Sequence, residues 1–310
     1  MDDQRYDCII VGAGPAGLSA SLFLSRYRLK TLTFHHSSPR NLYSHGIHGF
    51  LGHHGILPSE LLDRGRQEVT AHGGSIMEAR VIRIERARSD CFRVITGGDG
   101  RLEHSFFSRR LLLATGLRDN TPTCDGFHEF YGRSVHHCAD CDGFEHRDQH
   151  IAVLGHGKQL VGFVLNLLTW TNRLTILTDG HAEGVPAENR EQLNRFNITA
   201  REDKVRGLAG DRAQGHLQQV QFYNGEPLFC SALFFTLGSE PASDLHQQLG
   251  CREDENGLVR VDQTQHTSIE GVYAAGDLTP HSQLAVVAAA EGAMAAIHIH
   301  KSLLPDDRRP

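Results

Sequence analysis

A glycine-rich turn directly follows the first apolar segment of the chain. Residues 6–11 predict a buried strand, and Gly12, Gly14 and Gly17 then form the pattern G-x-G-x-x-G ahead of a helical segment over 18–28 and a strand over 30–34. Such glycines allow a tight turn, close approach of the backbone to a pyrophosphate, and close packing of helix on strand, and the helix N-terminus then faces the phosphates. The sequence therefore predicts a βαβ dinucleotide-binding unit at its start.

The same plan recurs in the middle of the chain. A strand over 151–154 leads into a turn with Gly155 and Gly157, followed by a helix over 161–169 and a strand over 173–178. The third small position holds Leu160, whose bulk is expected to push the helix away from the strand. A strand and turn over 271–277 and a helix over 283–302 close the chain. Two such starts predict an α/β protein with two nucleotide-binding-type domains.

Charge and length exclude several classes of protein. The 310 residues carry a formal charge of −6 without a long run of one sign, which argues against nucleic acid as a partner. Apolar stretches are too short to span a membrane, and the first five residues lack signal-peptide architecture, so cytoplasmic localisation is expected. Of the seven cysteines, five are scattered and are expected to be small buried hydrophobes: Cys8, Cys91, Cys124, Cys230 and Cys251.

The other two cysteines stand three residues apart. Cys138 and Cys141 can form a small reversible disulfide ring, and Asp142 can supply or take up a proton as the ring opens and closes. Two structural cysteines at a chance spacing are the alternative. A structural zinc site needs four ligands, and there is no second pair, so no metal is expected.

Five segments together resemble the low-molecular-weight thioredoxin reductases: 12–17, 113–116, 138–143, the turn at Gly155, and 276–277. The resemblance covers essentially the whole chain. It implies a thioredoxin reductase-like α/β fold of two Rossmann-like domains, the second inserted into the first. An FAD domain is expected over 1–120 and 245–310, and the inserted domain, which carries the cysteines and normally binds NADPH, over 121–244. A homodimer is also implied.

The resemblance assigns cofactor contacts residue by residue. The glycines of the first turn would meet the FAD pyrophosphate, Asp277 after Gly276 would bind the ribityl chain, and the backbone of Val81 would meet the adenine. Backbone N–H groups of Gln283 and Leu284 would face the flavin pyrimidine edge, where a helix N-terminus favours negative charge. The remaining expected contacts are Thr115, Gly116, Asn41 and His48. Within the redox pair, Cys138 would exchange with substrate, Cys141 would face the flavin, and Asp142 would donate the proton.

One departure from the family concerns the second nucleotide site. The family has a basic cluster there that binds the 2′-phosphate of NADPH, whereas this chain places Asp179 at the end of the strand and has no arginine between Arg173 and Arg190. A carboxylate would repel the phosphate but could accept a hydrogen bond from a free ribose 2′-hydroxyl, which leaves NADH open. Use of NADPH is therefore doubtful. Electrons would instead come from a protein such as ferredoxin, or through a second FAD in the vacated cleft.

Histidine is abundant, with 21 residues. The cluster His45, His48, His53 and His54 allows a metal site, but it lies on irregular glycine-rich backbone without a helical spacing. His136 and His137 precede Cys138 directly. One of them could stabilise a thiolate or shuttle protons. The other interpretation is that both are strand residues with solvent-facing rings.

Three functions remain open at this point. The leading interpretation is an FAD-dependent dithiol/disulfide oxidoreductase that acts on a thioredoxin-like protein. A small-molecule dithiol oxidase that passes electrons to oxygen is the second, although such relatives usually have Cys-Pro-x-Cys-His where this chain has Cys-Ala-Asp-Cys-Asp over 138–142. The third is a redox sensor or scaffold without turnover. The presence of Cys138, Cys141, Asp142 and Asp277 argues against this third function.

Overall fold

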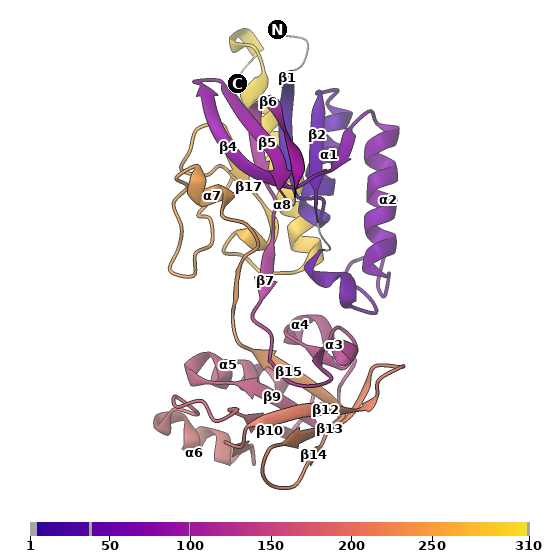
Figure 1. Ribbon diagram of the computed structural model, residues 1–310, viewed down its shortest axis with the longest axis vertical. Coiled ribbons are helices and arrows are strands. Elements are labelled where there is room, and N and C mark those ends of the chain that lie inside the picture. Colours follow the sequence, from indigo (N-terminus) through magenta and orange to yellow (C-terminus); the bar gives the residue numbers. More distant parts are fainter. Residues whose placement is uncertain (1–4, 37–38, 99, 309–310) are drawn as a thin grey trace. The chain divides into compact units, whose positions relative to one another are not determined.

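The computed structural model describes residues 5–36, 39–98 and 100–308. The first four residues, part of the segment searched for a signal peptide, lie outside this range. The chain forms two compact units (Figure 1). Unit 1 comprises Met1–Arg40, Ile56–Arg118 and Glu240–Pro310, and unit 2 comprises Asn41–Gly55 and Asp119–Ser239. The segment Asn41–Gly55, which the expected limits placed in the FAD domain, groups with unit 2, where His45 N donates to Gly132 O at 3.2 Å.

Unit 1 is built on a seven-stranded sheet of order β3-β2-β1-β6-β5-β4, with β17 paired to β6. The strands β1, β2, β3, β6 and β17 run parallel where they pair, and β4, β5 and β6 form an antiparallel meander. The strands are β1 (Arg5–Val11), β2 (Thr31–His35), β3 (Ser75–Glu78), β4 (Val81–Arg88), β5 (Cys91–Gly98), β6 (Arg101–Leu113) and β17 (Val272–Ala274). The helices are α1 (Pro15–Arg26), α2 (Pro58–Ala71), α7 (Leu245–Gln248) and α8 (Ala285–Leu303).

Alternate residues of β1 enter two different cores, because successive side chains of a strand point to opposite faces. Cys8 and Ile10 pack under α1 and the alanine-rich α8, while Ile9 and Val11 pack on the other face. The chain's first helix and its last long helix thus lie side by side (Figure 1). Gly292 permits this close approach, since a side chain there would collide with the backbone oxygen of Ala16.

Unit 2 repeats the parallel βαβ plan in a five-stranded sheet of order β11-β10-β9-β15-β8. A separate antiparallel sheet has the order β12-β13-β14. The strands are β8 (Val135–His136), β9 (Ile151–Gly155), β10 (Leu174–Leu177), β11 (Thr199–Arg201), β12 (Val205–Asp211), β13 (His216–Phe222), β14 (Leu228–Phe229) and β15 (Ala232–Thr236). The helices are α3 (Phe127–Phe130), α4 (Ala139–Asp142), α5 (Gly157–Leu167) and α6 (Ala187–Arg195).

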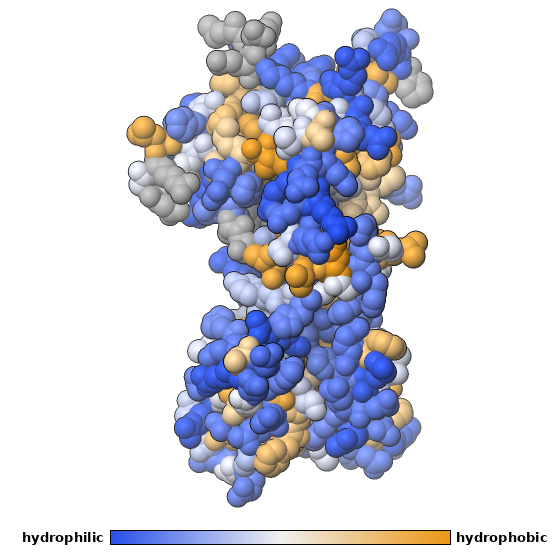
Figure 2. All heavy atoms as spheres, turned by 90° about the vertical axis from the view of Figure 1, so that its right-hand side faces the viewer, coloured by the Kyte–Doolittle hydropathy of each residue, from blue (hydrophilic) through white to orange (hydrophobic). Residues whose placement is uncertain are grey.

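Two short strands, β7 (Leu117–Asp119) and β16 (Ser239–Pro241), pair where the chain passes between the units. In unit 2, Leu160 is fully buried in the core cluster under α5, so its bulk becomes part of the packing. Of the five single cysteines, four are buried, as expected, and Cys124 is half-buried. Among the described residues, no helix is both long and apolar enough to cross a membrane, and the face seen in Figure 2 is predominantly hydrophilic.

Candidate active site

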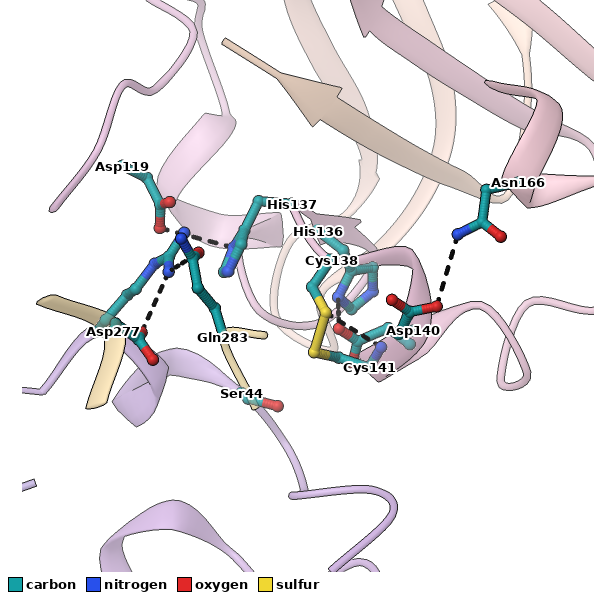
Figure 3. The surroundings of a disulfide bond; sticks show 12 residues. Ser44, Asp119, His136, His137, Cys138, Asp140, Cys141, Asn166, Asp277 and Gln283 are labelled. Carbon is teal, nitrogen blue, oxygen red and sulfur yellow. Dashed lines mark hydrogen bonds and ion pairs between the residues drawn. A yellow bond between two sulfur atoms is a disulfide. The ribbon is translucent and has the colours of Figure 1, made fainter. Parts of the chain in front are cut away.

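The two closely spaced cysteines are joined. Cys138 and Cys141 form a disulfide with a Cα–Cα distance of 5.3 Å (Figure 3). Cys138 follows β8 and caps α4, and its sulfur accepts a hydrogen bond from the backbone N–H of Cys141 at 3.1 Å. When the disulfide opens, this N–H is placed to stabilise negative charge on the Cys138 sulfur. The backbone at this point can therefore support a thiolate at Cys138.

Asp142 lies at the end of the same helical turn and contacts a buried histidine. Its Oδ2 lies 3.3 Å from Nδ1 of His136. Burial acts to raise the pKa of the Asp142 carboxyl, but the hydrogen bond from His136 and the positive charges of neighbouring histidines outweigh burial and lower the pKa overall. His136 is only 5% exposed, so the interpretation of this ring as solvent-facing is wrong. It is directed inwards by its packing on Phe234 of β15.

The second histidine before the disulfide contacts a different carboxylate. Nδ1 of His137 lies 3.6 Å from Oδ2 of Asp119 (Figure 3), and the same oxygen accepts a hydrogen bond from the hydroxyl of Tyr131 at 2.8 Å. The Asp119 side chain is buried. The two neighbouring histidines thus have separate acidic partners, Asp142 for His136 and Asp119 for His137.

In unit 1, the first glycine turn has the geometry that its spacing predicts. Gly12 has φ +113, and a side chain there would meet the backbone of Ala114, while a side chain at Gly17 would meet the oxygen of Gly12. At Gly14, the N-cap of α1, a Cβ would have no neighbour within 4 Å, and no side chain caps the helix. The N-terminus of α1 therefore has no side-chain cap and has free space beside Gly14, which suits a pyrophosphate.

The turn with Asp277 is held by residues that the sequence did not indicate. Gly276 has φ +77, and its N–H donates to the buried carboxylate of Glu291 at 2.7 Å. The Asp277 carboxylate pairs with Arg40 at 3.2 Å, and the same guanidinium nitrogen donates to Oε1 of Gln283 at 2.6 Å (Figure 3). Arg40 lies far from Asp277 in the sequence, and Glu291 lies on another element, α8. No local sequence pattern could therefore have indicated either residue.

The other expected cofactor contacts fall in both units. Thr115 and Gly116 follow β6, and Val81 begins β4. Leu284 is the N-cap of α8, and its N–H donates to Ser282 O at 2.9 Å. Asn41 and His48 belong to unit 2. The roles of all these residues towards FAD stay predictions.

Within the described part of the chain, two groups of side chains have the spacing of metal ligands. His48 and His54 lie near Glu145, and His156 and His181 lie near Glu183, with ligand atoms within 4.8 Å of one another in each group. The rings of His156 and His181 are stacked with an interplanar angle of 4°, so their lone pairs lie in two parallel planes. Each group has three donors, whereas a structural zinc site takes four.

Comparison with known proteins shows the family. Residues 6–292 match the pyridine nucleotide-disulphide oxidoreductases. The chain belongs to this family. It is 30% identical over 305 residues to thioredoxin reductase of Treponema pallidum (strain Nichols), covering 95% of this chain and 96% of that protein. This member of the pyridine nucleotide-disulphide oxidoreductases is a flavin-dependent disulfide oxidoreductase of the thioredoxin reductase type.

Solved structures of relatives agree with the α/β fold of two Rossmann-like domains. The putative thioredoxin reductase TrxB of Bacillus anthracis has a TM-score of 0.88 at 30% identity and covers 97% of this chain and 99% of its own. HlmI has a TM-score of 0.89 at 29% identity, with 98% and 94% covered. The family implies FAD, and the open glycine turn at α1 fits its pyrophosphate. When bound, FAD would supply the two-electron chemistry of this pyridine nucleotide-disulphide oxidoreductase.

Proposed function

We propose that the protein transfers electron pairs between FAD and a thioredoxin-like protein through Cys138–Cys141, and that NADPH is not its electron donor. The disulfide, whose Cys138 is the N-cap of α4, supports the first part of this proposal. Relatives named thioredoxin reductase, 25–30% identical along nearly the whole chain, support the choice of a thioredoxin-like partner. The second part rests on the glycine turn at the start of α5.

The turn that would hold the phosphates of a second dinucleotide is covered by this chain's own residues. The N–H of Gly157 donates to the oxygen of Gly184 at 2.9 Å, so this donor is already used. The carboxylate of Glu183 lies against Gly157, where even a Cβ would collide with it. His156 Nδ1 contacts Glu183 Oε2 at 3.2 Å. The half-exposed carboxylate of Glu183 therefore brings negative charge to the turn that would hold a pyrophosphate, and like charges repel.

Charge at the end of β10 also opposes NADPH. Asp179 lies just beyond this strand, and its carboxylate accepts a hydrogen bond from Val205 N at 2.7 Å, so one oxygen is engaged in the fold. A 2′-phosphate beside a carboxylate costs about 1–4 kcal/mol, depending on the effective dielectric. The aliphatic chain of Lys204 passes Gly180. A single lysine does not replace the bidentate contacts of an arginine cluster.

Electrons are then proposed to enter from a protein donor such as ferredoxin. A second FAD on unit 2 is the other route, but the position of Glu183 opposes any pyrophosphate at this turn, whichever dinucleotide carries it. The observation that carries the proposal is thus the contact of Glu183 with the Gly157 turn.

Anaerobic stopped-flow mixing with NADPH tests the choice of donor. The flavin absorbance is expected to persist at micromolar NADPH, and rapid bleaching would refute this part of the proposal. The ratio of flavin to protein distinguishes the two routes, since a ratio near one supports a protein donor and a ratio near two supports a second bound flavin. Chemically reduced protein mixed with thioredoxin should generate thioredoxin thiols. A Cys138→Ser variant, which lacks the exchanging sulfur, serves as the control.

A further inference from the structure

A chain of polar groups in unit 2 begins at Asp142, which directly follows Cys141 in the sequence. Nδ1 of His136 contacts Asp142 at 3.3 Å, and its Nε2 lies 2.9 Å from Nε2 of His146 and 3.1 Å from the backbone oxygen of Arg133. His146 in turn places Nδ1 3.3 Å from Oε1 of Gln149. The sequence Asp142, His136, His146, Gln149 is therefore continuous within hydrogen-bonding range.

The contacts fix which nitrogen of His136 exchanges a proton. A backbone oxygen can only accept, so Nε2 of His136 must carry hydrogen to face Arg133 O. In the neutral ring, Nδ1 then presents its lone pair to Asp142. In the charged ring, Nδ1 carries a second proton and donates it to the carboxylate. Protonation of His136 thus changes the one nitrogen that faces Asp142.

His146 completes the arrangement as an acceptor. Its Nδ1 donates to Gln149, which leaves the Nε2 lone pair for the N–H of His136. Burial, together with the charge of His136, lowers the pKa of His146 to about 4. His146 therefore remains neutral near pH 7 and holds the His136 ring in place. It is a positioning residue, since it acts through His136.

We propose that His136 is the proton source for the Cys138–Cys141 pair, with Asp142 as the relay between them and His146 as the residue that fixes the ring. An ionised Asp142 has no proton of its own to give, and the lowered pKa of this carboxyl keeps it ionised near neutral pH. Proton delivery to a leaving thiolate speeds its departure. The proposal rests on the proposed redox role of the disulfide and names the group that makes its opening pH-dependent.

Reduction by a small dithiol shows how the step balances. A thiolate of the dithiol bonds to Cys138 Sγ, the Cys138–Cys141 bond breaks, and its electron pair leaves on Cys141 Sγ. A proton moves from His136 Nδ1 to Asp142 and from Asp142 to Cys141 Sγ. The second thiol of the dithiol then loses its proton to solvent, and its sulfur displaces Cys138 as a thiolate and closes a cyclic disulfide. The dithiol is oxidised, the protein disulfide is reduced, and His136 regains its proton from water.

Other charged groups lie around His136 and Asp142 and influence how these two residues respond to pH. His137 adjoins His136, and His48 acts on Asp142 from the segment Asn41–Gly55. His45 of the same segment interacts with His136 and with Arg133. On the side of β15, the neighbour is the apolar ring of Phe234. Replacing His48 or His137 by a neutral residue is thus expected to shift the pH dependence of the rate of disulfide reduction. Removing the His136 ring should abolish this pH dependence.

The test measures how fast dithiothreitol reduces the disulfide in the purified FAD-containing protein. The reaction is quenched at set times, and the protein thiols that have formed are trapped and counted. The rate is divided by the concentration of dithiothreitol thiolate at each pH. In the wild-type protein, this normalised rate is expected to fall about tenfold between about pH 5.5 and 8, the range in which histidine titrates. His136→Gln should give a flat profile at the lower level. His146→Gln should keep the fall with a smaller amplitude, and His128→Gln, on the exposed face of α3, should match the wild type.

Several outcomes would overturn the assignment. A flat wild-type profile would do so without any variant, which covers the case in which His136→Gln does not fold. If the normalised rate of His136→Gln falls with pH as it does in the wild type, His136 is not the proton source. If His146→Gln alone abolishes the fall in rate, His146 is the group that responds to pH. A disulfide that dithiothreitol fails to reduce at any pH would instead contradict the proposed function.

Discussion

The carboxylate of Glu291 accepts a hydrogen bond from the backbone N–H of Gly276, with an O···N distance of 2.7 Å. It also accepts from the hydroxyl of Thr279 at 2.9 Å, and its other oxygen contacts His281 at 2.8 Å. A buried residue in the middle of α8 thus shapes the turn that presents Asp277. The last long helix therefore both packs on α1 and orients the expected ribityl contact.

Glu291→Ala is expected to destabilise this turn and weaken retention of FAD. The change leaves the buried N–H of Gly276 without its acceptor, which costs about 1–3 kcal/mol, whereas the hydroxyl of Thr279 keeps the backbone oxygen of Gly276 at 2.9 Å. Urea unfolding and the flavin content after gel filtration would measure both effects. Glu255→Ala, on an exposed turn, is the matched control. Equal stability and flavin content in the two variants would contradict the role given to Glu291.

The two cysteines are expected to differ in spectroscopic behaviour. Cys138→Ser should leave Cys141 as a lone thiolate beside oxidised FAD and produce a long-wavelength charge-transfer band, because the resemblance places Cys141 next to the flavin. Absorbance spectra of the two serine variants at alkaline pH provide the measurement. A band in Cys141→Ser and none in Cys138→Ser would show that the roles are reversed.

Removing the carboxylate over the second glycine turn should strengthen whatever affinity unit 2 has for a pyrophosphate. Glu183→Ala is expected to tighten ADP-ribose binding by about tenfold, since one repulsive charge pair near a protein surface is worth about 1–4 kcal/mol. Titration calorimetry measures the affinity. Glu188→Ala on α6 removes an exposed carboxylate of the same unit as a control. An unchanged affinity for ADP-ribose in Glu183→Ala would mean that this carboxylate does not oppose binding of a pyrophosphate at the turn.

His146 should make the protein less stable as the pH falls. Its folded-state pKa is lowered to about 4, whereas an unfolded histidine titrates near 6.5. The unfolded chain therefore binds the extra proton first, and about 3 kcal/mol of stability is lost as the pH falls from about 6.5 to 4. The contribution of Asp142 has the usual acidic sign and is lost only at lower pH, as the pH falls through its lowered pKa.

Urea unfolding of the wild type and His146→Gln across this range provides the measurement. The variant should lose less stability between these pH values, because glutamine does not titrate. His128→Gln should follow the wild-type curve, since that ring lies on the surface. Parallel curves for the wild type and His146→Gln would show that His146 has no part in the acid destabilisation.

Local sequence was sufficient wherever a feature lies within a few consecutive residues. The turn of Gly12, Gly14 and Gly17 is determined by sterics, because a Cβ at the first or third position would strike nearby backbone. The disulfide is equally local, since two cysteines on one helical turn lie 5.3 Å apart between Cα atoms. The two βαβ units, and with them the α/β fold, could be predicted for the same reason, because each unit begins with a few consecutive residues of one pattern. The alternation of apolar residues and glycines repeats in each unit.

Only the tertiary structure decided which groups surround these local features. His136 and His146 are ten residues apart, and Arg40 and Asp277 are separated by 237. Whether the His136 ring faced solvent or a carboxylate depended on how β8 packs beside β15, which no pattern in the sequence reports. The contact of Glu183 with Gly157 likewise arises because the loop after β10 folds back over the start of α5. Hydrogen bonds and charges act through space, so their partners became visible only once the sheets had brought distant segments together.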